Sequence, residues 1–153
     1  MSTIPVQETF VRRSLEIAAN AVHRGNHPFG ALLVRDNRIT LEAENTVFTE
    51  GNVTAHAELN LVRLAVRQYD SAFLAKCTLY TSTEPCAMCA GAIYWAGIAS
   101  VVFACSAERL ADFAGQHLSV SCRVIFSSGA RETVVIGPIL ESEAERVHAA
   151  YWR

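Results

Sequence analysis

Four stretches of the chain place apolar residues at helical spacing. The first covers residues 10–22 and is followed by Gly25, a residue that commonly ends a helix. The second begins after Thr54, whose hydroxyl can cap a helix, and the third begins after Pro85 and stops before Gly97. We therefore expect helices over residues 10–22, 55–69, 86–96 and 141–151, with a shorter helical turn over residues 107–113.

Short apolar or alternating runs separate these helices and predict strands. The runs at residues 29–34 and 39–43 flank Asp36 and Asn37, a pair that favours a tight turn, so the two runs should form a hairpin. Residues 115–131 show no clear pattern. Strands that alternate with helices are typical of a layered α/β sandwich with parallel pairing among the later strands. The later strands are expected over residues 77–82, 100–105 and 133–136.

Composition favours a single domain with a sizeable core. The chain has 153 residues, of which 51% are hydrophobic and 18% are charged. A chain of this size buries about two-thirds of its unfolded surface. Because no repeat or linker interrupts the sequence, we expect one domain over residues 1–153. The chain is more apolar than an average soluble domain, so we also expect an oligomer, most simply a homodimer.

Charge and targeting signals narrow the functional classes. The formal net charge is -2, so no overall charge attracts the protein to nucleic acid or to an anionic membrane. No stretch approaches the ~20 apolar residues of a membrane span. The first ten residues do not resemble a leader, and the five cysteines are an odd number in a chain that needs no disulfides. We therefore expect a cytoplasmic protein with reduced thiols.

The strongest chemical signal combines two short motifs. A His-Ala-Glu run at residues 56–58 and a Pro-Cys-Ala-Met-Cys run at residues 85–89 both fall where a predicted helix begins. Their side chains can therefore converge at one edge of a sheet. Zinc prefers imidazole nitrogen and thiolate sulfur, and His56, Cys86 and Cys89 supply three such ligands. Three protein ligands leave a fourth position for water, as in catalytic zinc sites.

Glu58 is expected to be the catalytic group. It stands two residues beyond His56, too close to serve comfortably as a fourth ligand but well placed to reach a metal-bound water. In that position it can take the water proton and later deliver protons to a ring nitrogen and to departing ammonia. Cys77, Cys105 and Cys122 lie in apolar contexts and are expected in the core, so no fourth ligand is evident.

Two non-catalytic interpretations use the same residues. A Cys-x-x-Cys pair also occurs in redox proteins, and a structural zinc module could pair with an active subunit. Neither interpretation requires Glu58, whereas hydrolysis does. The presence of Glu58 beside the three ligands therefore favours an enzyme.

With these motifs, the chain resembles the cytidine and nucleobase deaminase superfamily, whose zinc base deaminases share this signature. The resemblance covers nearly the whole chain. Within the superfamily, the chain looks most like bacterial guanine deaminases and tRNA adenosine deaminases. It implies a three-layer α/β/α sandwich with a five-stranded mixed sheet and one Zn²⁺ per chain. The matching segments are His27 to Ala31, Asn45, Thr54 to Glu58, and Leu79 to Trp95.

The resemblance also implies which residues contact the substrate. Asn45 matches an asparagine that bonds the edge of the ring, and Phe29 matches an aromatic residue that packs on the base. The backbone around Ala57 adds a further contact. Trp95 matches the tryptophan of the Ile-Tyr-Trp motif of guanine deaminases, although a core role for Trp95 stays open.

His117 departs from the guanine deaminase pattern. It stands where those enzymes carry an acidic residue that faces the amidine edge of the purine. Guanine offers N–H donors there, which suit a carboxylate better than a neutral imidazole. Guanine itself is therefore in doubt, unless Asp112 takes the acidic role or His117 lies on the surface without one.

The expected substrate is a free nucleobase or a related aminated heterocycle, with purine-like rings preferred. The alternative is the wobble adenosine of tRNA. Docking of a folded RNA needs several Lys or Arg near the site. Residues 106–121, which follow the Cys-x-x-Cys helix, contain one basic residue, Arg109. A small-molecule substrate is therefore favoured, and RNA stays as the second interpretation.

Overall fold

Strands and helices alternate along the chain in the computed structural model, which describes residues 4–115 and 117–152. The strands are β1 (Gly30–Arg35), β2 (Arg38–Glu44), β3 (Thr78–Thr83), β4 (Ser100–Cys105) and β5 (Val134–Ile136). The helices are α1 (Ile4–His23), α2 (Val47–Glu50), α3 (Ala57–Gln68), α4 (Ser71–Leu74), α5 (Ala87–Ala96), α6 (Ala107–Ala114), α7 (Cys122–Ser127) and α8 (Glu141–Tyr151).

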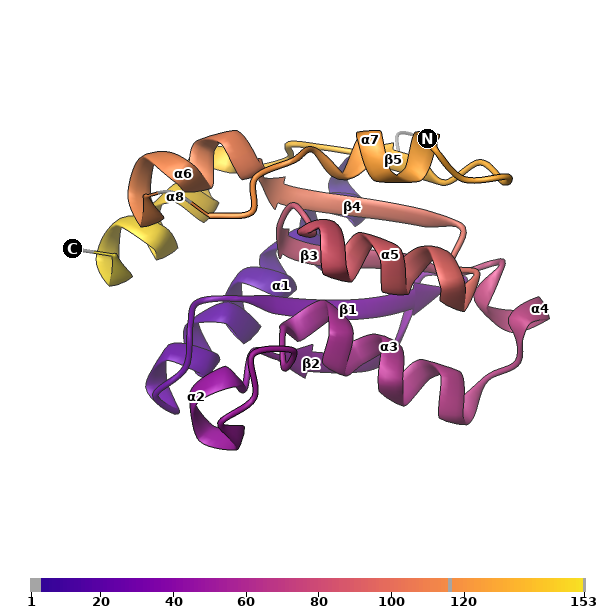
Figure 1. Cartoon of the computed structure of the whole chain (residues 1–153), viewed down its shortest axis with the longest axis horizontal. Helices are drawn as coiled ribbons and strands as arrows, with labels where there is room; N and C mark the ends of the chain where they lie inside the picture. The colour runs from indigo at the N-terminus through magenta and orange to yellow at the C-terminus, as the bar shows by residue number, and fades with distance from the viewer. Residues whose placement is uncertain (1–3, 116, 153) are drawn as a thin grey trace.

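The five strands form one mixed sheet in the order β2-β1-β3-β4-β5 (Figure 1). β1 pairs antiparallel with both β2 and β3, whereas β3, β4 and β5 run parallel. The predicted hairpin is β1–β2, and its turn places Asp36 and Asn37 at φ 51° and 60°. Left-handed residues of this kind give a turn whose twist matches that of the strands. The parallel pairing predicted for the later strands is confirmed.

Helices cover both faces of the sheet, each over its own apolar core. On one face α3 and α5 run side by side and, with α7, bury Leu61, Ile93 and Phe126 (Figure 1). On the other face α1 and α8 bury Val11 and Ala144 against the strands. The three-layer α/β/α sandwich is therefore confirmed.

The start of α3 differs from the prediction. Thr54 donates its hydroxyl hydrogen to Oδ1 of Asn52, at 2.7 Å, and its backbone N–H bonds the same oxygen. Thr54 thus stabilises a turn that precedes the helix, and the prediction that it caps the helix is wrong. The residue in the N-cap position is His56, with extended backbone angles of φ −68° and ψ 152°. This shift places the predicted metal ligand at the very start of α3.

The spacing of hydrophobic residues did not predict the shortest helices. α2, α4 and α7 have four to six residues, which is too short for a 3.6-residue period to show. α7 lies within residues 115–131, where no element was predicted. α1 begins at Ile4, six residues before the predicted start. Within the described ranges, no helix is both long enough and apolar enough to cross a membrane.

We expect Gly30→Ala to destabilise the protein, because β1 crosses α1 closely at this residue. An added Cβ would lie 2.5 Å from the carbonyl oxygen of Ser14 and 2.6 Å from the backbone nitrogen of Ala18. Overpacking of this kind costs about 1–3 kcal/mol of unfolding free energy, measurable by urea denaturation.

Gly91→Ala is the matched control. A Cβ at Gly91, inside α5, meets nothing within 4 Å. Alanine is also the better helix former, so this variant should gain about 0.5–1 kcal/mol. A Gly30→Ala protein as stable as the wild type would contradict the close approach of β1 to α1.

Candidate active site

Two helix N-termini meet at one end of the sheet. α3 begins after His56 and α5 begins after Cys86, and the two helices pack against each other. Cys86 closely follows the carboxyl end of β3, the edge at which α/β proteins commonly place their sites. The His56 side chain makes no capping hydrogen bond to α3, and the Cys86 thiol interacts with Cys89 in the first turn of α5. Both side chains point toward a common centre.

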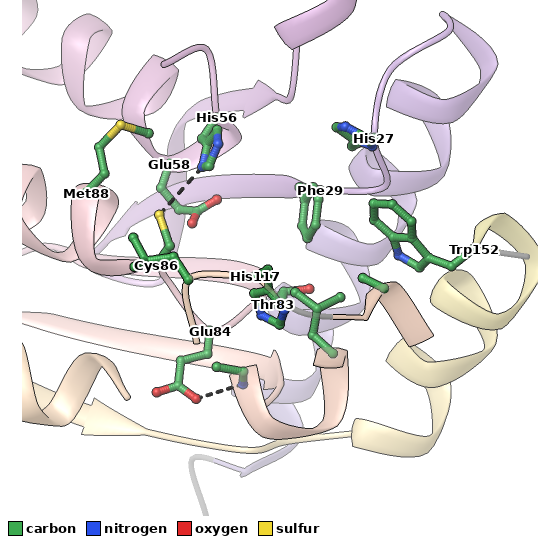
Figure 2. Close-up of a pocket in the computed structure, with 14 residues that line it drawn as sticks. His27, Phe29, His56, Glu58, Thr83, Glu84, Cys86, Met88, His117 and Trp152 are labelled. Carbon is green, nitrogen blue, oxygen red and sulfur yellow. Dashed lines mark hydrogen bonds between the residues drawn. The ribbon is translucent and has the colours of Figure 1, made fainter. Parts of the chain in front are cut away.

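The predicted metal ligands converge on that centre. Nδ1 of His56 lies 3.6 Å from Sγ of Cys86 and 3.6 Å from Sγ of Cys89 (Figure 2 shows the first contact). Tetrahedral zinc, with its usual bond lengths to nitrogen and sulfur, would separate such atoms by about 3.6 Å. The donor set and its spacing therefore fit zinc. Among the residues that the structure describes, no other His, Cys, Asp or Glu joins this cluster.

The remaining cysteines lie where the sequence analysis expected them. Cys77, Cys105 and Cys122 are buried in the apolar cores. Burial raises the pKa of the Cys105 thiol to about 12, which keeps it protonated. These three residues are consequently separate from the ligand cluster.

The environment of the ligand thiols favours one thiolate before any metal binds. A hydrogen bond from Cys89 lowers the pKa of the Cys86 thiol to about 4. The same hydrogen bond, together with burial, raises the pKa of Cys89. The hydrogen bond to Cys86 also raises the pKa of His56. The pair at the start of α5 thus shares a proton that a divalent cation would displace.

Glu58 lies in the first turn of α3, beside the ligands, and is 5% exposed. Burial, reinforced by the nearby Cys86 thiolate, raises the pKa of its carboxyl group to about 7. A divalent cation at the cluster would favour the ionised carboxylate and oppose this shift. Glu58 is therefore placed beside the ligand cluster as a carboxylate that can accept a proton there.

A cavity of about 320 Å³ opens beside the ligand cluster (Figure 2). Its wall contains two of the ligands and Glu58, half of its lining side chains are apolar or aromatic, and it includes no Lys or Arg. The size is near the lower limit of pockets that hold small molecules, which is roughly 300 Å³. The lining residues are His27, Phe29, His56, Glu58, Thr83, Glu84, Cys86, Met88, Ala107, Leu110, Ala114, His117, Leu118 and Trp152.

Two of the predicted substrate contacts line this cavity. Phe29 precedes β1, and His117 follows α6 (Figure 2). Nδ1 of His117 lies 3.0 Å from the carbonyl oxygen of Gly115, which can only accept. Nδ1 therefore carries a hydrogen, and in the neutral form of the ring Nε2 is an acceptor. Nε2 is buried without a hydrogen-bond partner among the described residues.

The other predicted contacts do not line the cavity. Asn45 is buried at the end of β2 and accepts a hydrogen bond from the backbone of Val47, at 3.1 Å. Ala57 is buried behind His56 as the first residue of α3. Trp95 is 84% exposed on α5, so it is not a core residue of the single chain. The substrate roles of Asn45, Ala57 and Trp95 remain predictions.

Several lining residues were not singled out as substrate contacts in the sequence. Thr83, the last residue of β3, and Glu84 precede the cysteine motif, and like His27 they belong to segments that resemble the superfamily. Trp152 lies in the wall of the cavity of its own chain. The neighbouring Tyr151 hydroxyl lies 3.1 Å from Nδ1 of His27. The C-terminal end of α8 thereby meets the segment before β1, a contact that no local pattern could reveal.

Glu84 ties the wall of the cavity to the sheet. Its carboxylate accepts hydrogen bonds from the backbone of Ala107 at 2.9 Å, the backbone of Cys122 at 2.8 Å and the hydroxyl of Ser121 at 3.0 Å. Burial alone would raise the pKa of Glu84, but these bonds to the charged form outweigh it and lower the pKa. One carboxylate thus fixes the starts of α6 and α7 beside β3.

Comparison with known proteins agrees with this geometry. Residues 5–105 match the family described as the cytidine and deoxycytidylate deaminase zinc-binding region. A Schizosaccharomyces pombe protein named probable cytosine deaminase is 38% identical over 149 residues, covering 94% of this chain and 90% of that protein. Bacillus subtilis guanine deaminase is 45% identical over 98 residues, covering 63% of each protein.

A solved structure shows that the similarity to deaminases extends to the fold. It comes from a study of A-to-I editing by tRNA:A34 deaminases at the wobble position and is 30% identical to this chain. The two superpose with a TM-score of 0.72 over 92% of this chain and 99% of the other. With the ligand cluster, the buried glutamate and the family match in agreement, this chain belongs to the cytidine and deoxycytidylate deaminase zinc-binding family.

Proposed function

We propose that this protein hydrolyses the exocyclic amino group of a free nucleobase or a closely related aminated heterocycle, with purine-like rings preferred. The observation that carries the proposal is the small cavity beside His56, Cys86 and Glu58. Its apolar and aromatic wall suits a flat, uncharged ring. Phe29 offers a face for stacking, and Nε2 of His117 offers an acceptor for a ring N–H.

The side chains of this site would divide the reaction between binding and proton transfer. When bound, zinc is a Lewis acid that makes water nucleophilic at neutral pH. Glu58 would take one proton from the attacking water and pass it to the ring nitrogen next to the reacting carbon. It would then take the second proton from the hydroxyl added to that carbon and deliver it to the amino group, so that the C–N bond breaks, ammonia leaves and a carbonyl forms. The apolar wall excludes other water, which strengthens each polar contact with the ring.

The distribution of basic residues favours a small substrate over RNA. No Lys or Arg lines the cavity. Arg109, close by on α6, is bound by Glu145 and Asp112, and Arg12 on α1 is bound by Glu143. Guanidinium groups held by carboxylates in this way contribute little to the counterion release that drives binding to phosphates.

Deamination of the tRNA wobble adenosine is the second candidate. It is favoured by the structural match to a protein from a study of tRNA:A34 deaminases, which this chain covers almost completely. Arg63 and Arg67 of α3 line a second pocket that shares no residue with the cavity, and they are basic groups from which an RNA contact could be built.

A substrate panel separates the two candidates. We expect purified protein to release ammonia from at least one of guanine, adenine, cytosine and related aminated heterocycles, measured by a coupled assay. A tRNA anticodon stem-loop should bind weakly and gain no inosine. Inosine formation with salt-sensitive binding, and no ammonia from any free base, would replace the first candidate with the second.

Variants of the cluster should separate metal binding from proton transfer. We expect Cys86→Ala to lose both zinc and turnover, because a ligand is missing. Glu58→Gln should retain zinc yet lose kcat by about 10²- to 10⁴-fold, the usual contribution of a general acid–base group. Zinc is measured by elemental analysis, at one ion per wild-type chain.

Cys105→Ala is the matched control, because Cys105 is a buried cysteine outside the cluster. It should keep both zinc and activity. Full activity of Glu58→Gln, or of metal-stripped wild type, would refute the assigned roles.

We further propose that the protein is a homodimer joined through the outer face of α3, α5 and α7. Trp95 projects from α5 with 84% of its surface exposed, and Leu64, Val66 and Val124 are exposed on the neighbouring helices. Apolar residues gathered on one layer of helices are typical of an interface.

Trp95→Ala should therefore shift the protein from dimer to monomer in light scattering at micromolar concentration, because a large aromatic anchor is lost. Val53→Ser, an exposed apolar residue outside this layer, should leave the dimer intact. An unchanged mass of Trp95→Ala would exclude this face as the interface.

A further inference from the structure

A chain of hydrogen bonds runs from the C-terminal end of α8 to the wall of the cavity. Nε1 of Trp152 donates to Nδ1 of His148 at 3.0 Å, and Nε2 of His148 lies 2.9 Å from Oγ1 of Thr83. His148 is 1% exposed and Thr83 is 2% exposed. Thr83 and Trp152 both line the cavity (Figure 2).

The indole N–H of Trp152 determines which atom is the donor in each of these hydrogen bonds. The N–H of Trp152 can only donate, so Nδ1 of His148 must carry a lone pair. Burial lowers the pKa of His148 to about 4, so the ring is neutral at physiological pH. A neutral imidazole with a bare Nδ1 has its hydrogen on Nε2. His148 therefore donates to Thr83, and the hydroxyl oxygen of Thr83 accepts.

The hydroxyl of Thr83 then has one hydrogen left to donate. Among the residues that the structure describes, no group accepts it. A buried hydroxyl hydrogen without a partner is costly, and the cavity is the space that Thr83 borders. The unsatisfied donor is therefore available to a ligand in the cavity.

We propose that Thr83 is a specificity-determining residue, whose hydroxyl donates a hydrogen bond to a carbonyl oxygen or ring nitrogen of the substrate, and that Trp152 and His148 fix this direction. The inference rests on the proposed function, because it assumes that the substrate occupies this cavity. With Nε2 of His117 as an acceptor in the same wall, the site would select rings that carry both an acceptor and an N–H group.

Substitution of Thr83 tests the donor. Thr83→Val keeps the shape but removes the hydroxyl, whereas Thr83→Ser keeps the hydroxyl. We expect Thr83→Val to lower kcat/KM on guanine or cytosine by about 10- to 100-fold, the usual effect of an unsatisfied buried acceptor, and Thr83→Ser to retain most activity. Thr78→Val, the same change on β3 at a residue bonded to Ser100, is the control.

Substrate analogues identify the atom that receives the hydrogen bond. With an analogue that lacks the contacted acceptor, wild type and Thr83→Val should have nearly the same kcat/KM. The probes are 2-aminopurine and 7-deazaguanine beside guanine, and 4-aminopyrimidine beside cytosine. A merely structural role of Thr83 would reduce activity on every probe alike.

Trp152→Phe tests whether the indole N–H of Trp152 sets the direction of the hydrogen bond between His148 and Thr83. Phenylalanine keeps an aromatic ring but has no N–H, so His148 is free to move its hydrogen to Nδ1 and to accept from Thr83 instead. We expect Trp152→Phe to reduce activity on the same probes as Thr83→Val, and the double variant to lose little more. The ¹⁵N shifts of His148 should show a protonated Nε2 in the wild type and a larger share of protonated Nδ1 in Trp152→Phe.

The outcomes separate this inference from the proposed function. If the wild type releases ammonia but Thr83→Val is unaffected, or is affected equally on all probes, the inference fails and the proposed function stands. A protonated Nδ1 in the wild type would also overturn the inference. A wild type without turnover on any base would overturn both.

Discussion

The packing of α3 against α5 is the constraint on which the rest of the structure depends. It brings two N-cap residues, His56 and Cys86, to the carboxyl end of β3, where Nδ1 of His56 lies 3.6 Å from Sγ of Cys86. The positive ends of two helix dipoles then face one point, which favours thiolates and a buried carboxylate. The metal ligands, Glu58 and the adjoining cavity follow from this single contact.

Segments far apart in the chain complete the cavity, and buried polar groups hold them in place. Glu84 binds the starts of α6 and α7 through backbone N–H groups. His148 joins α8 to β3. Each of these groups lies in an apolar setting, where an unsatisfied hydrogen bond is expensive, so their geometry is closely determined. These bonds hold parts of the wall in place, although much of it comes from loops and helix ends.

The balance of charge around the cavity matches uncharged ring chemistry. Basic side chains of α1 and α6 are engaged by carboxylates, and none enters the cavity wall. The polar groups there include the carboxylate of Glu58, a bare nitrogen on His117 and a hydroxyl on Thr83. In a mostly apolar pocket, such groups select a ligand by the pattern of its donors and acceptors.

The sequence by itself determined the order of the longer helices and strands and the His56, Cys86 and Cys89 cluster, because hydrophobic period and ligand chemistry are local properties. The three-layer sandwich followed from the resemblance to a known superfamily. The sequence did not determine the orientation of single residues: Thr54 stabilises a turn instead of capping α3, and Trp95 faces outward from α5. It also gave no sign that Thr83, His148 and Trp152 meet. Only the tertiary structure decided these points, because they depend on packing between segments up to 65 residues apart along the chain.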